Sequence, residues 1–119
     1  MSDVPCTVTV SNGVLACKPE TLTVSRSQQQ DGIKWTFANS GYTFTGVTID
    51  GVPAPTGDFG APEIGSNSAG RSTMRVSDSV QNLKFYSYKL QYLDDKGQPG
   101  ESPVKVEGGI TTPQIKNQN

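Results

Sequence analysis

The sequence predicts an all-β fold, a single-domain Greek-key β-sandwich of about seven strands that spans residues 1–119. Apolar residues recur at every second position in successive runs, which is the spacing of a strand with one buried face, whereas helical spacing is hard to find. Turn-forming Gly, Asn, Asp and Pro residues separate the runs. The 119 residues suffice for one core, and the hydrophobic fraction of 33% favours a thin core beneath a polar surface.

Seven runs carry this alternation. They are CTVTV (6–10), ETLTV (20–24), IKWTF (33–37), YTFTGVTI (42–49), STMRV (72–76), LKFYSYKLQYL (83–93) and SPVKV (102–106). In the third run the side chains of Ile33, Trp35 and Phe37 share one face, so Trp35 is expected to fill the space between two sheets. In the fourth run the apolar positions change phase at Gly46, which predicts a β-bulge there.

The dipeptide Asn12-Gly13 follows the first run and predicts a two-residue hairpin turn. This register pairs Val8 with Cys17 and makes Cys6 a diagonal neighbour of Cys17 on the same face. A loop one residue longer or shorter would place the two cysteines on opposite faces. A disulfide and a pair of small buried thiols therefore both stay open, and a reducing compartment favours the thiols.

Two segments depart from the strand pattern. Residues 50–72 are rich in Gly, Pro and Ser and are expected to form one long loop, a class of connection that often carries function. Phe59 and Ile64 are the residues that could anchor this loop to the sandwich. Residues 109–119 are expected to form a polar C-terminal tail that only Ile110 and Ile115 could hold.

The order of these features carries a family resemblance. The first half has a proline, a T-V strand, a glycine turn and a strand with I-x-W, which here are Pro19, Leu22-Thr23-Val24, Gly32 and Ile33 to Trp35. The second half adds Tyr86-Ser87-Tyr88 before a turn and Val104 to Gly108 after it. Over about 90 residues this order resembles the cupredoxin family, and an immunoglobulin-like sandwich shares much of the pattern.

The resemblance implies a copper site that this chain cannot form. A blue-copper site uses two imidazoles and a thiolate, commonly with a weak thioether. The family pattern would place the first histidine near residues 42–45 and the cysteine near Leu90, but neither position holds a ligand and the chain has no histidine. Cys6 and Cys17 lie at the other end of the chain. The sequence therefore predicts a cupredoxin-like scaffold without metal and without another cofactor.

Composition argues against several functional classes. Without histidine the chain lacks Ser-His and Cys-His pairs and histidine-based zinc sites, so no enzyme is expected. Ten basic and eleven acidic residues give a net charge of −1 and are scattered, which argues against nucleic-acid binding. No run approaches the ~20 apolar residues of a membrane helix. The amino terminus has no signal-peptide pattern, which predicts a cytoplasmic location, or a secreted or periplasmic one if a leader was removed.

The candidate binding patch is expected at the end of the sandwich where the resemblance would place copper. It comprises Tyr42, Phe59, Tyr92, Asp94 and Asp95. The two carboxylates belong to the turn sequence Asp-Asp-Lys-Gly. The favoured interpretation is a solvated β-turn whose Asp side chains accept hydrogen bonds from local backbone N–H groups. The alternatives are a general acid–base pair or a weak calcium site.

These observations predict a non-catalytic binding or assembly module whose partner is a protein or a glycan. Binding through loops held by a rigid frame is expected first. Strand addition at a sheet edge is the other candidate surface, and edge pairing would also support a homodimer. The alternative function is a carbohydrate-binding module, which requires a pair of exposed, coplanar aromatic rings among Tyr42, Phe59 and Tyr92.

Overall fold

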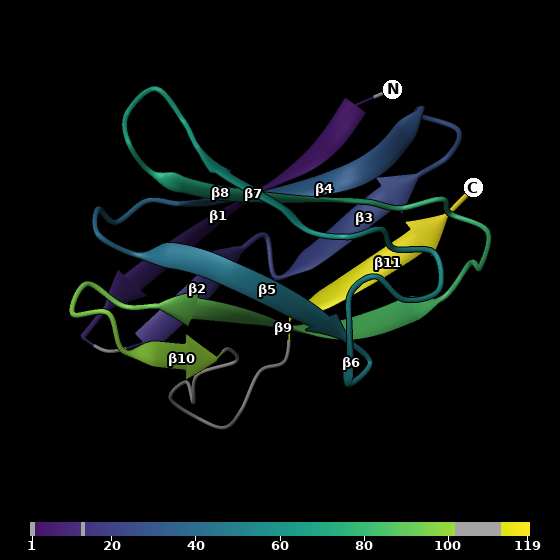
Figure 1. The fold of residues 1–119 in the computed structure, drawn as a ribbon. Helices are drawn as coiled ribbons and strands as arrows, with labels where there is room; N and C mark the ends of the chain where they lie inside the picture. The colour runs from purple at the N-terminus through teal and green to yellow at the C-terminus, as the bar shows by residue number, and fades with distance from the viewer. Residues whose placement is uncertain (1, 13, 102–112) are drawn as a thin grey trace.

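The computed structural model describes residues 2–12, 14–101 and 113–119, and all of their regular structure is β-strand (Figure 1). None of these residues belongs to a helix that could cross a membrane. The strands are β1 (Ser2–Ser11), β2 (Val14–Lys18), β3 (Thr21–Ser25), β4 (Gln30–Phe37), β5 (Thr43–Ile49), β6 (Val52–Pro53), β7 (Glu63–Ser66), β8 (Ser72–Ser77), β9 (Phe85–Leu93), β10 (Pro99–Glu101) and β11 (Gln114–Gln118).

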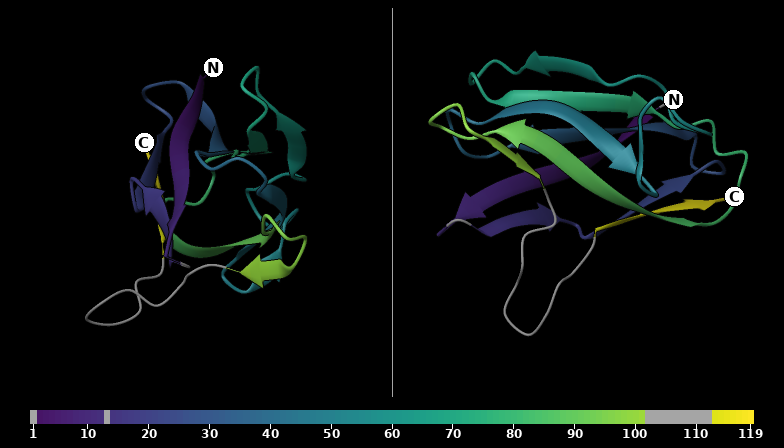
Figure 2. Two further views of the ribbon diagram at one scale, coloured as in Figure 1. Left: turned by 90° about the vertical axis from the view of Figure 1, so that its left-hand side faces the viewer. Right: turned by 60° about the horizontal axis from the view of Figure 1, so that its bottom comes forward.

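The strands form two sheets that face each other across the core (Figures 1 and 2). One sheet has five strands in the order β2-β1-β4-β8-β7. The other has six, in the order β3-β11-β9-β5-β6, with β10 paired to the end of β9. Two pairs are parallel, β1 with β4 and β11 with β3, and the remaining pairs are antiparallel. The predicted two-sheet sandwich is confirmed.

The predicted number of strands is wrong, because the described residues form eleven strands and not about seven. Six of the expected runs correspond to β1, β3, β4, β5, β8 and β9, and the run at 102–106 lies outside the described residues. The further strands are β2, β6, β7, β10 and β11, which have two to five residues each. Strands this short are held mainly by their neighbours, so alternation within the strand is a weak signal.

The predicted first hairpin is confirmed in its register. Val8 pairs directly with Cys17 across β1 and β2, and Asn12 in the turn has a positive φ of 53°. Cys6 and Cys17 are both buried and both free thiols. The bulge expected at Gly46 is confirmed as well, because the pairing of β5 with β9 shifts between Phe44 and Gly46.

Both segments expected to lack strands contain them. Residues 50–72 include β6 and β7, and Phe59 is 2% exposed, so it anchors this segment as expected, whereas Ile64 is 46% exposed. The expected polar tail contains β11, which lies between β3 and β9. Ile115 and Asn117 of β11 face inward, while Gln114 is exposed. A strand is recognised from the sequence by apolar residues at its inward positions. In β11 one of the two inward positions holds a polar residue, so this signal is lost.

The core lies between the two sheets and is aromatic at its centre. Trp35, Phe37 and Tyr88 are fully buried, which confirms the prediction that Trp35 fills the interior. The Trp35 and Tyr88 rings lie 5.4 Å apart, and Trp35 Nε1 donates a hydrogen bond to the Tyr88 hydroxyl at 3.3 Å. Such a bond satisfies the indole donor, which burial would otherwise leave unpaired.

Candidate functional site

One end of the sandwich brings together four of the five residues of the predicted patch. Tyr42 precedes β5 and Tyr92 lies near the end of β9, and their ring centroids are 6.2 Å apart with planes inclined by 44°. Both rings also contact Phe37, at centroid distances of 5.5 and 5.8 Å. Asp94 and Asp95 follow β9 in the adjoining turn. Both tyrosines are half-buried, so this end is a packed aromatic cluster and not an open stacking platform.

Phe59 does not join this cluster. Its ring packs edge-on against Tyr86 at 5.0 Å, and its backbone forms a bridge with Asp78. Tyr86 lies at the beginning of β9 and Tyr92 near its end, so most of the length of that strand separates the two groups. A turn at residues 56–59 directs Phe59 inward, a backbone feature that its sequence neighbours did not reveal.

Burial and nearby charge keep both patch tyrosines in the neutral phenol form. Partial burial raises the pKa of Tyr42 above its usual value near 10, and the carboxylates of Asp95 and Asp94 raise it further. The pKa of Tyr92 is raised by burial, then by Tyr42 and by Asp94. Both phenols therefore remain protonated at neutral pH and can donate a hydrogen bond.

The turn after β9 confirms the favoured interpretation of the Asp-Asp-Lys-Gly sequence for Asp94. Asp94 Oδ1 accepts hydrogen bonds from the backbone N–H groups of Lys96 and Gln98, at 2.9 and 2.8 Å. The backbone N–H of Gly97, whose φ is positive, donates to the Asp94 carbonyl at 3.0 Å. The Asp94 carboxylate thus stabilises the turn.

A groove without charged lining residues lies between the outer edges of the two sheets, and we call it the edge groove. Its volume is about 410 Å³. The five-stranded sheet contributes residues of β7 and the segment before it, and the six-stranded sheet contributes residues of β5, β6 and β9. All of its lining residues are uncharged: Thr45, Gly46, Val47, Pro53, Ala54, Pro62, Ile64 and Gln91.

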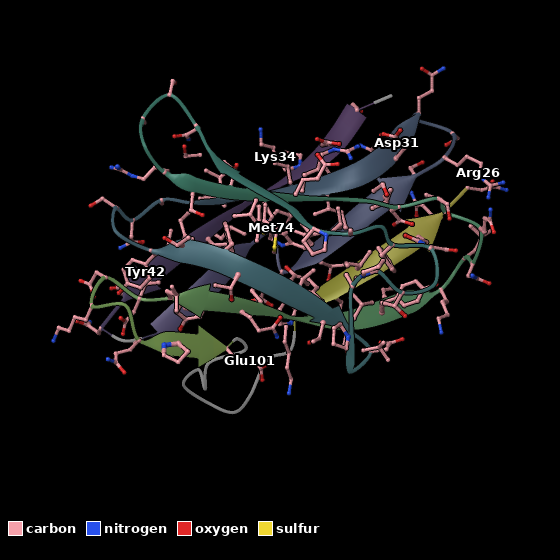
Figure 3. The ribbon with its side chains drawn as sticks, in the orientation of Figure 1. Arg26, Asp31, Lys34, Tyr42, Met74 and Glu101 are labelled. Carbon is pink, nitrogen blue, oxygen red and sulfur yellow. The ribbon has the colours of Figure 1, made fainter. Side chains whose placement is uncertain are left out.

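Ile64 of β7 has the orientation of a core residue but is 46% exposed. It pairs directly with Met74 of β8, and opposed residues of an antiparallel pair project from the same face. Met74 is fully buried in the centre of the molecule (Figure 3). Because β7 is the outermost strand of its sheet, as Figure 2 shows, the opposite sheet leaves Ile64 open to solvent at the groove.

A second hollow adjoins the edge groove beside the β9–β10 hairpin, and we call it the hairpin hollow. Its volume is about 490 Å³, and Thr45 and Gln91 line both hollows. Gln91 Nε2 donates to Glu101 Oε2 at 2.8 Å, which fixes the amide at the boundary between them. The remaining lining residues are Tyr92, Pro99, Gly100 and Glu101 itself.

Replacement of Gly100 by alanine is expected to displace the Tyr92 ring from the hairpin hollow and to cost about 1–3 kcal/mol of unfolding free energy. A Cβ atom at Gly100 would lie 2.7 Å from Tyr92 Cζ. Urea denaturation and the Tyr92 ring resonances measure the two effects. Gly65→Ala is the matched control, because its Cβ would meet Thr73 Oγ1 at an ordinary 3.7 Å. Equal stability of the two variants would contradict the close packing of Tyr92 on Gly100.

The edge groove was not predicted from the sequence because its lining comes from separate segments of the chain. The composition of residues 50–72 predicts a loop, whereas this segment supplies the edge strand β7. The one local signal is Ile64, an apolar residue in the otherwise polar sequence Glu-Ile-Gly-Ser. Gln91, which also lines the groove, has no such signal in its local sequence.

No group of three or more His, Cys, Asp or Glu side chains is placed to hold a metal ion within residues 2–12, 14–101 and 113–119. A comparison with protein-family models finds no family that matches the chain, and a comparison with curated proteins finds no match.

Proposed function

We propose that this chain is a non-catalytic binding or assembly module that binds an extended polypeptide segment at the free edge of β7. The observation that supports this most directly is Ile64, an inward-facing but exposed side chain on an outermost strand. The backbone of such a strand offers N–H and C=O groups to an added strand. The scaffold is proposed to be a cupredoxin-like or immunoglobulin-like sandwich without a metal.

The edge groove suits a polypeptide because it lies beside a strand edge. Side chains of an added strand would point alternately into the groove and away from it, which gives specificity at every second position. Uncharged lining residues favour an apolar side chain at the inward positions, since a charged one would lose its hydration without a partner. Thr45 and Gln91 supply the polar contacts.

The carbohydrate alternative has less support from the geometry. It needs two exposed and coplanar rings, whereas Tyr42 and Tyr92 are half-buried with planes inclined by 44°, and Phe59 is buried elsewhere.

Deletion of residues 50–72 would not separate loop binding from edge binding, because that segment contains β7 itself. Point substitutions are needed instead.

An Ile64→Lys variant is expected to weaken peptide binding by about tenfold or more. The test selects ligands for the immobilised protein from a random dodecapeptide library and measures their affinity by fluorescence anisotropy. Selected peptides should carry apolar residues at alternate positions. The substitution places a charge on the free edge and in the uncharged groove, which opposes strand addition.

Leu83→Lys is the matched control, because Leu83 is 54% exposed and does not line the edge groove. It should bind the selected peptides like the unmodified protein. Peptides unaffected by Ile64→Lys would contradict the proposed site. A concentration-dependent dimer that Ile64→Lys dissolves would assign the edge to a second copy of the chain, and ligands found only on a glycan panel would favour the carbohydrate alternative.

A further inference from the structure

The C-terminal strand β11 ends on the side of the sandwich opposite Tyr42 (Figures 1 and 3). Three polar side chains are buried together there, and one of them belongs to β11. Asp58 lies in the segment between β6 and β7, Asp78 follows β8, and Asn117 belongs to β11. Asp78 is 1% exposed and Asn117 is 2% exposed. Asn117 Nδ2 donates to Asp58 Oδ2 at 3.2 Å and to Asp78 Oδ1 at 3.1 Å, so one amide joins two carboxyl groups.

Asp58 has a donor for each of its oxygens. Besides Asn117, Oδ2 accepts the backbone N–H groups of Gln81 and Asn82, at 3.1 and 2.9 Å. Oδ1 accepts the side-chain amide of Asn82 at 3.1 Å. Hydrogen bonds from within the described residues thus occupy both oxygens of the Asp58 carboxylate.

The other two side chains each have one unpaired oxygen. Asp78 Oδ1 accepts the backbone N–H of Val80 at 3.0 Å, but Asp78 Oδ2 and Asn117 Oδ1 are buried without a hydrogen-bond partner in the described part of the chain. Buried polar atoms nearly always have a hydrogen-bond partner, so two unpaired oxygens in one cluster need an explanation. Turning the Asn117 amide over would not supply one, because its oxygen would then face two carboxyl oxygens.

We propose that Asp78 binds a proton on Oδ2 in the folded protein and donates it to Asn117 Oδ1. The contact from Asn117 Nδ2 to Asp78 Oδ1 is already present, so the added bond closes a ring of two hydrogen bonds between a carboxyl and an amide. One proton satisfies both unpaired oxygens. The result is a buried proton-binding site that ties β11 to the segment after β8.

Asp78 forms no ion pair with a cation among the described residues. The Asp58 carboxylate is linked to Asp78 through the shared Asn117 amide. The Arg26 guanidinium donates to the Val80 carbonyl oxygen, and the Tyr86 phenol, with its pKa raised by burial and then by Asp58 and Asp78, is neutral. Two other cations form ion pairs with other carboxylates: Lys84 with Asp50 at 3.8 Å, and Arg75 with Asp3 at 2.9 Å and with Asp31 at 3.9 Å.

This environment favours the protonated carboxyl. The pKa of Asp78 is raised from 3.8 to about 6, mainly because the carboxyl is buried; the hydrogen bonds from Val80 and Asn117 oppose this rise, and the charge of Asp58 adds to it. The folded protein therefore holds a proton that the unfolded chain releases above about pH 4. The contribution of Asp78 to stability is fully present below pH 3.8 and is lost as pH rises through about 6. We expect β11 to be held more firmly at pH 5 than at pH 8.

An Asp78→Asn variant tests this site because its amide N–H would donate to Asn117 Oδ1 at every pH. Between pH 5 and pH 8 the folding equilibrium of the unmodified protein should weaken by about tenfold relative to this variant. Urea denaturation at both pH values gives the ratio. Asp94→Asn is the matched control: its carboxyl also accepts two backbone N–H groups, but in a turn at the surface, and it should follow the unmodified protein.

Carbon-13 NMR of the unmodified protein decides the question even if Asp78→Asn fails to fold. The Asp78 carboxyl carbon should titrate near pH 6, and the Asn117 side-chain amide resonances should follow the same curve. A carboxyl that stays ionised from pH 4 to 8 would overturn the proposal. So would a response of these resonances to calcium or sodium chloride at pH 7, which would assign the two oxygens to a cation.

Discussion

A Trp35→Ala variant is expected to lose about 3–5 kcal/mol of unfolding free energy. Trp35 of β4 is fully buried, and its ring centroid lies 5.4 Å from that of Tyr88. Truncation removes the largest buried side chain, leaves a cavity between the sheets, and deprives the Tyr88 hydroxyl of the Trp35 donor. Since a domain commonly has about 5–15 kcal/mol in total, a loss of this size would bring the protein close to unfolding.

Far-UV circular dichroism during urea denaturation measures this loss without using tryptophan fluorescence. Lys34→Ala is the control, because Lys34 is the exposed neighbour of Trp35 on the other face of β4 (Figure 3). Its effect should stay within about 0.5 kcal/mol. If the two variants unfold at the same urea concentration, the central position of Trp35 in the core is wrong.

An Asp58→Ala variant is expected to lose about 3 kcal/mol or more. The Asp58 carboxylate accepts hydrogen bonds from two backbone N–H groups, at Gln81 and Asn82, and from the side-chain amides of Asn82 and Asn117. Alanine would leave these donors without their acceptor, and water would not replace it easily because Asp58 is only 6% exposed. The segment at residues 81–82 and the strand β11 would both lose a fixed attachment.

Asp94→Ala is the matched control for this loss, because Asp94 also accepts two backbone N–H groups but in a turn at the surface. Water can replace its contacts, so its cost should be nearer 1 kcal/mol. A second variant, Asp58→Asn, keeps a side-chain acceptor but removes the charge, and it should lower the pKa of Asp78. Equal losses for Asp58→Ala and Asp94→Ala would show that the buried cluster does not hold the two segments.

Local pattern was sufficient for several features of this fold. The pairing of Val8 with Cys17 follows from a two-residue turn, since turn length fixes the register of a hairpin. The inward position of Trp35 and the bulge at Gly46 follow from the period of two along a strand. Each of these depends on residues within about ten positions of one another, which a reader of the sequence can see together.

The C-terminal strand is a feature that the local sequence pattern does not predict. Gln114–Gln118 has one apolar residue, Ile115, and reads as a polar tail, yet it lies inside a sheet between β3 and β9. Asn117 occupies an inward position because Asp58 and Asp78, both distant in sequence, receive its amide hydrogens. A buried polar residue is stable only where its partners are, and those partners are set by the tertiary fold.

The sequence by itself determined the fold class, the first hairpin, the inward face of the central strands and the absence of histidine ligands from the whole chain. Only the tertiary structure decided which strands became edges, that Phe59 packs away from Tyr42 and Tyr92, and that Ile64 borders an uncovered groove. The physical reason is the distance along the sequence between the residues that determine each feature. Side-chain alternation is a property of one strand, whereas an edge, a groove or a buried carboxyl is defined by which distant segments lie beside it.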